Sequence, residues 1–207
     1  MPPHRPTQED LLIERSLAGD PAALQGLLVR NLPTLETYIR LRSPDLVGPR
    51  ESVTDLAQST CREILENLDR FQHGGEGHFR AWLYETADRK LKNRRRHNHA
   101  QRRDVKRVRP MDSAHDAARH LAGFRGVHTP SAHAEAREEL DELVDCLDEI
   151  GEEPRRLILL ARIAKIPHRV IAERQKMSEA TVRQALHRAL AALAERIASR
   201  RRPEPPS

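Results

Sequence analysis

Residues 167–196 read PHRVIAERQKMSEATVRQALHRALAALAER, and this pattern predicts a helix, a tight turn and a second helix. Ser178 is predicted to cap the second helix, because its hydroxyl can accept a hydrogen bond from the free amides of the next turn. Apolar residues then recur at helical spacing and predict a buried stripe: Val182, Leu186, Ala189, Leu190 and Leu193. The segment therefore has the form of a helix-turn-helix with a basic outer face.

Polar side chains of this second helix fall outside the apolar stripe. A short helix that presents Arg and Gln behind a capped N-terminus suits the major groove of DNA, where both side chains can make bidentate contacts to base edges. We therefore expect six residues to contact DNA: Ser178, Thr181, Arg183, Gln184, His187 and Arg188. The alternative for this segment alone is an amphipathic surface helix whose charged residues face water.

The composition favours small helical domains. Of 207 residues, only 3% are aromatic and 32% are charged, which suits modest cores and extensive solvent contact. The sequence has no apolar run long enough to cross a membrane and no apolar signal-peptide core near its first residue, so we expect a cytoplasmic protein. Cys61 and Cys146 lie in separate helical patterns and are interpreted as reduced, buried thiols rather than as a disulfide.

Charge alternates in blocks along the chain. Residues 1–88 carry a net charge of −5, residues 89–109 carry +10, residues 110–153 carry −9 and residues 154–207 carry +9. Two basic blocks separated by an acidic one suggest two contacts on a polyanion, whereas a single basic tail would predict one. Charge alone also suggests that the acidic helix predicted over 135–153 shields the basic surfaces.

The periodicity predicts an all-α fold of two small helical domains joined by a flexible linker. Helices are expected over residues 7–18, 21–43, 54–71, 78–96 with a basic extension to about Arg109, 135–153, 154–164, and in the helix-turn-helix. Pro33 should kink or divide the second helix, and Thr54 should cap the third. Leu11 and Leu65 are among the residues expected to face inward. The domains are expected at 1–109 and 135–207, with a linker at 110–134 and a disordered tail over residues 200–207.

Two sets of motifs resemble a known family. Asp55-Leu56-Ala57-Gln58 opens a helix, Asp69-Arg70-Phe71 follows, and Phe79-Arg80-Ala81-Trp82-Leu83-Tyr84 leads into an arginine-rich helix. These runs resemble the second domain of bacterial sigma factors. Ser178-Glu179-Ala180-Thr181-Val182-Arg183 and His187-Arg188-Ala189 resemble the fourth domain. The order, with no third domain between them, resembles the extracytoplasmic-function (ECF) class, over about residues 8–105 and 135–198.

The resemblance implies that the helix beginning near Asp55 docks on the clamp helices of RNA polymerase. Four polar residues of this helix are the candidates: Asp55, Gln58, Arg62 and Glu63. The alternative is a solvated helix surface, since an aspartate near a helix N-terminus is also favoured by the helix dipole.

The loop over residues 73–78 is the candidate for capturing a flipped promoter base, because its glycines allow close approach. Its residues of interest are His73, Gly74, Gly75 and His78. The basic helix that follows suits phosphates, which dominate affinity but carry no sequence information. Its candidates are Arg89, Lys92, Asn93, Arg94, Arg95 and Arg96, of which Asn93 is placed to read a base edge. Phe79 and Trp82 are predicted to pack in the core rather than to stack on bases.

Two positions depart from the family pattern. Lys176 stands where members usually carry a glycine in the turn, which predicts a slightly strained or altered turn. Val170 stands where an acidic residue commonly precedes the Ile-Ala pair. Both departures bear on how the motif docks on DNA.

The resemblance implies a bacterial sigma factor that brings core RNA polymerase to selected promoters. Core polymerase and promoter DNA are then the expected partners, and an anti-sigma factor is a further partner that the family admits. We expect no enzyme activity, no cofactor and no metal, since no catalytic motif and no metal-ligand spacing occurs among the eleven histidines. A stand-alone helix-turn-helix regulator and a helical nucleic-acid-processing enzyme remain the alternatives.

Overall fold

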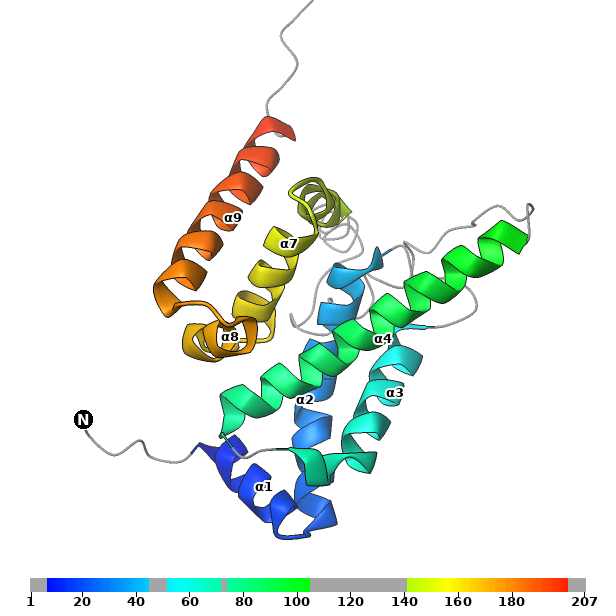
Figure 1. Cartoon of the computed structure of the whole chain (residues 1–207), viewed down its shortest axis with the longest axis vertical. Helices are drawn as coiled ribbons and strands as arrows, with labels where there is room; N and C mark the ends of the chain where they lie inside the picture. The colour runs from blue at the N-terminus through cyan, green and yellow to red at the C-terminus, as the bar shows by residue number, and fades with distance from the viewer. Residues whose placement is uncertain (1–6, 45–51, 72–73, 105–140, 201–207) are drawn as a thin grey trace, which may run out of the picture.

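The computed structural model describes residues 7–44, 52–71, 74–104 and 141–200, and side chains within 98–104 are not described. Every regular element within these ranges is helical, so the all-α prediction is confirmed (Figure 1). The elements are α1 Gln8–Leu17, α2 Pro21–Arg42, α3 Val53–Glu66, a 3₁₀ turn Leu68–Arg70, α4 Glu76–Asp104, α7 Glu152–Ile158, a π-helical turn Leu159–Ile163, α8 His168–Gln175 and α9 Glu179–Arg200. Residues 141–149 form a further helix. The predicted linker 110–134 lies outside the described residues.

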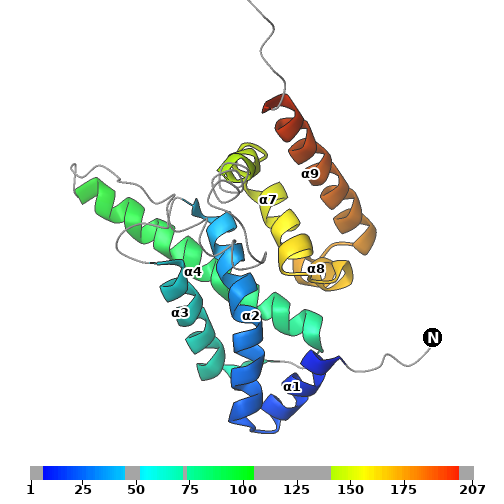
Figure 2. The same cartoon turned by 180° about the vertical axis from the view of Figure 1, so that it is seen from behind.

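The first module consists of α1 to α4. Helix α2 packs between α1 and α3, and α4 lies along α3 (Figures 1 and 2). The centre of this module is apolar, with Leu27, Leu35 and Ile64 at 1% exposure or less. Pro33 does not divide α2, which is assigned as one helix from Pro21 to Arg42. Of the two outcomes predicted at Pro33, a kink or a division, division is therefore excluded.

Aromatic side chains hold the module's last two elements together. The rings of Phe71 and Trp82 stack with centroids 5.3 Å apart, and Phe79 meets Phe71 edge-on at 5.8 Å. Phe79 is fully buried and Trp82 is half-buried. The prediction that both pack in the core is confirmed.

Two residues predicted to face inward are exposed instead. Leu11 is 48% exposed and Leu65 is 50% exposed. In α1 the buried apolar side chain is Ile13, and in α3 the buried apolar side chains are Val53, Leu56, Ala57 and Ile64. Leu11 lies two positions before the buried Ile13, and Leu65 lies one position after the buried Ile64. Helical spacing alone does not fix which of several neighbouring apolar residues faces inward.

The second module consists of the helical residues 141–149 and α7 to α9. The π-helical turn carries α7 onward, with Ala164 donating its amide to the Leu159 carbonyl at 2.9 Å. Arg200, at the end of α9, pairs with Asp145 at 2.9 Å and with Glu149 at 2.6 Å. Two acidic residues of this helix, Asp145 and Glu149, therefore pair with an arginine of their own module. Cys61 and Cys146 are free thiols, and burial raises the pKa of Cys61 to about 11.

The two modules contact each other along one side. Helix α2 lies against the π-helical turn, and α4 lies against α8 (Figures 1 and 2). Among the described helices, none is long and apolar enough to cross a membrane.

We predict that Tyr38→Phe lowers the free energy of unfolding by about 1.5–3 kcal/mol, the usual contribution of a hydrogen bond to a charged group. The Tyr38 hydroxyl is fully buried and donates to the Asp88 carboxylate at 2.9 Å. Tyr84→Phe is the matched control, since Tyr84 is equally buried and its hydroxyl makes no hydrogen bond within the described residues. Urea unfolding measures both, and equal losses in the two variants would contradict the prediction.

Candidate polymerase and DNA interfaces

The helix-turn-helix forms as its periodicity predicts. The Ser178 hydroxyl accepts a hydrogen bond from the Thr181 amide at 3.0 Å, which confirms Ser178 as the cap of α9. The Ser178 and Thr181 hydroxyls also bond to each other at 2.7 Å. The inner side of α9 carries the buried residues Val182, Leu186 and Ala189, and the partly buried Leu190 and Leu193 pack against the same core.

The outer face of α9 is open to solvent at its first turns. Arg183, Gln184, His187 and Arg188 are all exposed. Arg183 has only a long contact, 3.9 Å, to Glu179 one turn earlier, and its side chain is 62% exposed. A surface ion pair of this kind contributes little, so the guanidinium is available to another partner.

The turn between α8 and α9 holds a strained lysine. Lys176 has φ 55° and ψ 43°, the left-handed region, and its amide donates to the Glu173 carbonyl at 3.2 Å. Met177 then donates to the Ala172 carbonyl at 3.0 Å, which closes the end of α8. This confirms the strained turn expected from the missing glycine. Lys165 is the other non-glycine residue with positive φ in the described part of the chain.

The exposed side of α3 divides into free and engaged residues. Gln58 and Arg62 are exposed and make no hydrogen bond or ion pair within the described ranges. Glu63 accepts from Lys90 at 2.9 Å and pairs with Arg89. Burial opposes ionisation of Glu63, but the hydrogen bonds from Lys90 and Arg89 lower its pKa. The four predicted docking residues thus lie on one helix, but they differ in whether their side chains make hydrogen bonds or ion pairs.

Asp55 is engaged in capping, and the predicted cap of α3 is wrong. Ser52, not Thr54, is the N-cap, and its hydroxyl accepts from the Asp55 amide at 3.1 Å. Asp55 returns the contact by accepting from the Ser52 amide at 3.0 Å, a capping box. The hydrogen bonds from the Ser52 amide and hydroxyl lower the pKa of Asp55. The Ser-x-x-Asp spacing was readable in the sequence.

The basic helix also presents its residues unequally. Arg89 pairs with Glu63, and Arg95 lies 3.8 Å from Glu152 of the second module. Arg94 is half-buried, whereas Lys92, Asn93 and Arg96 are exposed. These three residues line an open pocket on α4 together with Glu85, Asp88, Arg89 and Arg156.

The loop before α4 is shorter than predicted. Helix α4 begins at Glu76, so His78 lies in its first turn rather than in the loop, and His73 lies outside the described residues. Gly75 adopts φ 79°, a conformation that favours glycine. The Gly74 carbonyl lies 2.6 Å from His78 Nδ1.

The start of α4 is fixed by a residue of α1 that carries no local signal in the sequence. The Asp10 carboxylate accepts from the Glu76 amide at 2.8 Å, and the Thr7 hydroxyl donates to the Glu76 carboxylate at 2.8 Å. Both come from the beginning of α1, and no local pattern signals a contact across so many residues. A carboxylate at this helix N-terminus is favoured by the helix dipole.

The comparisons with known proteins match both modules. Residues 27–101 match the family model for Sigma-70 region 2, and residues 140–193 match the family model for Sigma-70, region 4. No curated protein matches the chain.

We predict that Lys176→Gly raises the free energy of unfolding by about 0.5–1 kcal/mol. Glycine removes a left-handed strain of about 1–2 kcal/mol, and the greater freedom of glycine in the unfolded chain offsets part of that gain. Ala194→Gly is the control: it lies exposed within α9 and should lose about 1 kcal/mol. Thermal unfolding compares the two, and a loss in both variants would show that the turn is not strained.

Proposed function

Because this chain belongs to the ECF class of sigma factors and directs promoter-specific transcription initiation, we propose that its three exposed surfaces divide the work. Gln58 and Arg62 on α3 hold core RNA polymerase. The start of α9 reads the upstream promoter element as duplex. The loop before α4 and the open side of α4 engage the downstream element as it opens.

The exposed start of α9 is the observation that carries the proposal. Arg183 and Gln184 project from a helix whose N-terminus is capped and whose opposite side is buried, so the helix is held rigidly while these side chains stay free. Arg and Gln can each make bidentate contacts to base edges in the major groove. The hydroxyls of Ser178 and Thr181 hydrogen-bond to each other. We therefore assign these two residues to the helix cap and to contacts with nearby phosphates.

The open side of α4 suits the sugar-phosphate backbone. Lys92 and Arg96 are exposed and make no ion pair with a carboxylate among the described residues, and Asn93 lies between them in the sequence. Phosphate contacts position a protein on DNA, whereas Asn93 is the uncharged residue suited to a base edge. Arg89, which Glu63 neutralises, is a weaker candidate.

The family comparisons do not favour a stand-alone regulator, and sigma factor families are not enzymes. The proposal places the protein in the bacterial cytoplasm, because core polymerase and promoter DNA are there. Co-purification from cells tests this partnership and also reveals whether an anti-sigma factor binds.

We predict that Gln58→Ala with Arg62→Ala weakens binding to core polymerase and leaves the fold stable. Both side chains are exposed and make no hydrogen bond within the described residues, so their loss should change stability by less than about 0.5 kcal/mol. Asp55 is excluded from this test, since removing a capping side chain costs about 0.5–2 kcal/mol by itself. Binding is measured by fluorescence anisotropy with purified core polymerase.

The control is Gln25→Ala with Arg30→Ala, an exposed glutamine and arginine on α2. This variant should bind core polymerase like the unaltered protein. Unchanged affinity in the α3 variant would remove Gln58 and Arg62 from the docking surface.

We predict that substitutions on α9 and on α4 change different properties of DNA binding: promoter discrimination for α9 and overall affinity for α4. Arg183→Ala should relax promoter choice, because a good bidentate base contact contributes about 1–3 kcal/mol of discrimination. Lys92→Ala with Arg96→Ala should weaken binding across sequences, and each lost phosphate contact should reduce the slope of log affinity against log salt by about 0.9 on duplex or about 0.7 on single strands.

The measurement is holoenzyme binding to matched and mismatched promoters over a salt series, with Arg30→Ala as the control on α2. A uniform loss in Arg183→Ala, together with altered discrimination in the α4 variant, would reverse the two assignments.

A further inference from the structure

The open pocket on α4, which we call the α4 pocket, carries an excess of positive charge. Seven residues line it: Glu85, Asp88, Arg89, Lys92, Asn93, Arg96 and Arg156. All but Arg156, which comes from α7, recur at helical spacing along one side of α4. Its volume of about 250 Å³ lies below the range of about 300–1,000 Å³ for pockets that take drug-sized ligands. A small anion is therefore the kind of ligand that the size and the charge of this pocket suit.

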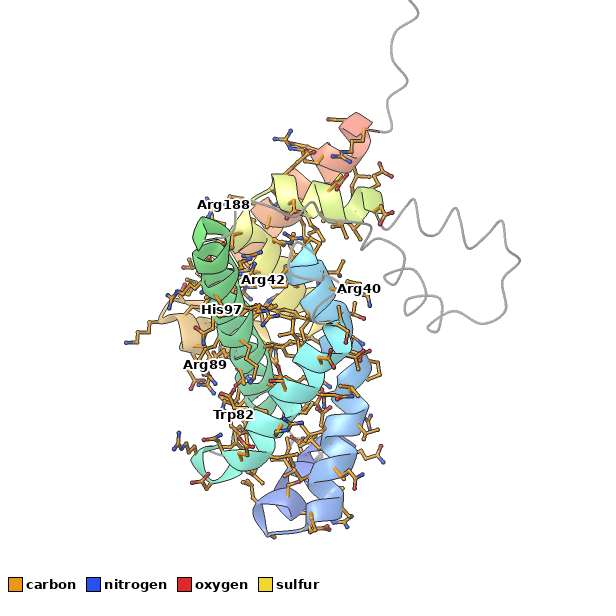
Figure 3. The ribbon with its side chains drawn as sticks, turned by 90° about the vertical axis from the view of Figure 1, so that its right-hand side faces the viewer. Arg40, Arg42, Trp82, Arg89, His97 and Arg188 are labelled. Carbon is orange, nitrogen blue, oxygen red and sulfur yellow. The ribbon has the colours of Figure 1, made fainter. Side chains whose placement is uncertain are left out.

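The most buried carboxylate of the pocket is already compensated. Asp88 is 5% exposed and accepts from the Tyr38 hydroxyl at 2.9 Å. Its other oxygen accepts from Arg156 Nε at 2.6 Å. Arg42, at the end of α2, lies 3.4 Å from the same carboxylate and is 3% exposed (Figure 3). Two cations and a hydroxyl thus face this single negative charge, so it repels an incoming anion less than an unpaired carboxylate would.

Arg156 is held in place with part of its guanidinium unused. Only Nε takes part in the contact with Asp88, and the two Nη groups make no hydrogen bond within the described part of the chain. The side chain is 19% exposed. A guanidinium is a rigid planar fork that can bind phosphate oxygens through two parallel hydrogen bonds. Because Asp88 already orders this fork, Arg156 loses little further freedom when an anion binds.

Three more cations lie on the α4 side of the pocket. Lys92 and Arg96 are exposed and make no ion pair among the described residues. Arg89 pairs with Glu63 through one Nη group, and its side chain remains 56% exposed. Side chains one helical turn apart have Cβ atoms about 5–6 Å from each other, so Lys92 and Arg96 can reach the same ligand. A single exposed cation binds an anion weakly in water, whereas several that converge beside an ordered guanidinium act together.

Glu85 is the carboxylate of the pocket that opposes an anion. It lies 3.7 Å from Arg174 of α8, and its side chain is 33% exposed. This distance and exposure make the pair weak, so the charge of Glu85 is only partly compensated. Removing that charge should therefore favour an anionic ligand.

We propose that the α4 pocket binds a phosphoanhydride group, supplied either as free pyrophosphate or as the diphosphate of a nucleotide. Arg156 binds one phosphoryl group, and Lys92 and Arg96 bind the other. Cations on two sides of the pocket suit two linked phosphoryl groups better than one isolated phosphate. On the proposed function, which assigns Lys92 and Arg96 to DNA, the bound group competes with the downstream promoter element.

Isothermal titration calorimetry of the full chain with inorganic pyrophosphate tests the site, at constant ionic strength and without divalent cations. We expect one site, with an affinity about tenfold or more above that for orthophosphate. Lys92→Gln with Arg96→Gln should weaken pyrophosphate binding about tenfold. The matched control is Arg30→Gln with Arg70→Gln, which removes the same charge from two exposed arginines outside the pocket. This control should bind pyrophosphate like the unaltered chain.

Two further variants separate the pocket from a general basic surface. Arg156→Lys keeps a cation beside Asp88 but removes the planar fork, and should weaken pyrophosphate binding about tenfold. Glu85→Gln should strengthen it about threefold, because a partly compensated negative charge is lost. Glu66→Gln is the control for Glu85→Gln, since Glu66 is an exposed carboxylate on α3 outside the pocket.

ADP and AMP distinguish the two sources of the ligand. Tighter binding of ADP than of pyrophosphate assigns the site to a nucleotide, and the reverse order assigns it to free pyrophosphate. AMP contains no anhydride and should bind no better than orthophosphate. The proposal is overturned if orthophosphate binds as tightly as pyrophosphate, or if the pocket variants match their controls. Circular dichroism verifies folding, and Glu85→Gln decides the question if Arg156→Lys loses its helices, because misfolding would not strengthen binding.

Competition with DNA is measured by fluorescence anisotropy of a labelled promoter oligonucleotide bound to holoenzyme, again without divalent cations. Pyrophosphate should displace the oligonucleotide, and it should do so at a lower concentration in Glu85→Gln than in Glu66→Gln. Equal concentrations in these two variants would overturn the competition. Oligonucleotide binding without pyrophosphate tests the proposed function by itself, so failure of one is distinguishable from failure of the other.

Discussion

The Asp88 carboxylate is the constraint on which the arrangement of the modules depends. A buried carboxylate is costly unless cations and hydrogen-bond donors surround it. Tyr38 and Arg42 supply part of that surrounding from α2, and Arg156 supplies the rest from α7. One carboxylate on α4 thus contacts both α2 and α7, and it links the second module to the first.

Carboxylates also pair with basic residues elsewhere in the protein. Glu63 neutralises Arg89 and Lys90 on the basic helix, while Asp145 and Glu149 neutralise Arg200 at the end of α9. Basic blocks that look uniform in the sequence are therefore divided into paired and open cations. The open cations include Lys92 and Arg96 on α4 and Arg183 on α9. A polyanion that contacts them would compete with fewer carboxylates of the protein itself.

The sequence was sufficient for features that depend on local periodicity. The helix-turn-helix, the Ser178 cap and the aromatic core around Phe79 follow from spacing over a few residues. The assignment of Thr54 as a cap failed because the Ser52–Asp55 capping box competes for the same helix end. The Asp10–Glu76 contact and the Asp88 cluster join residues far apart in the chain, and no repeat or periodicity marks such pairs. Local helix geometry was thus predictable from the sequence, but which charged side chains are engaged in ion pairs was not.

The π-helical turn over Leu159–Ile163 gives the second module a property of its own. A π turn accommodates one residue more than an α turn, and each residue advances an α-helix by about 100°. Deleting one residue here would restore an ordinary helix and swing everything after it by about that angle. Ile166 and Val170 would leave the core, and α9 would face another direction. The number of residues in this turn therefore sets the direction of α9, independently of the identity of any side chain on it.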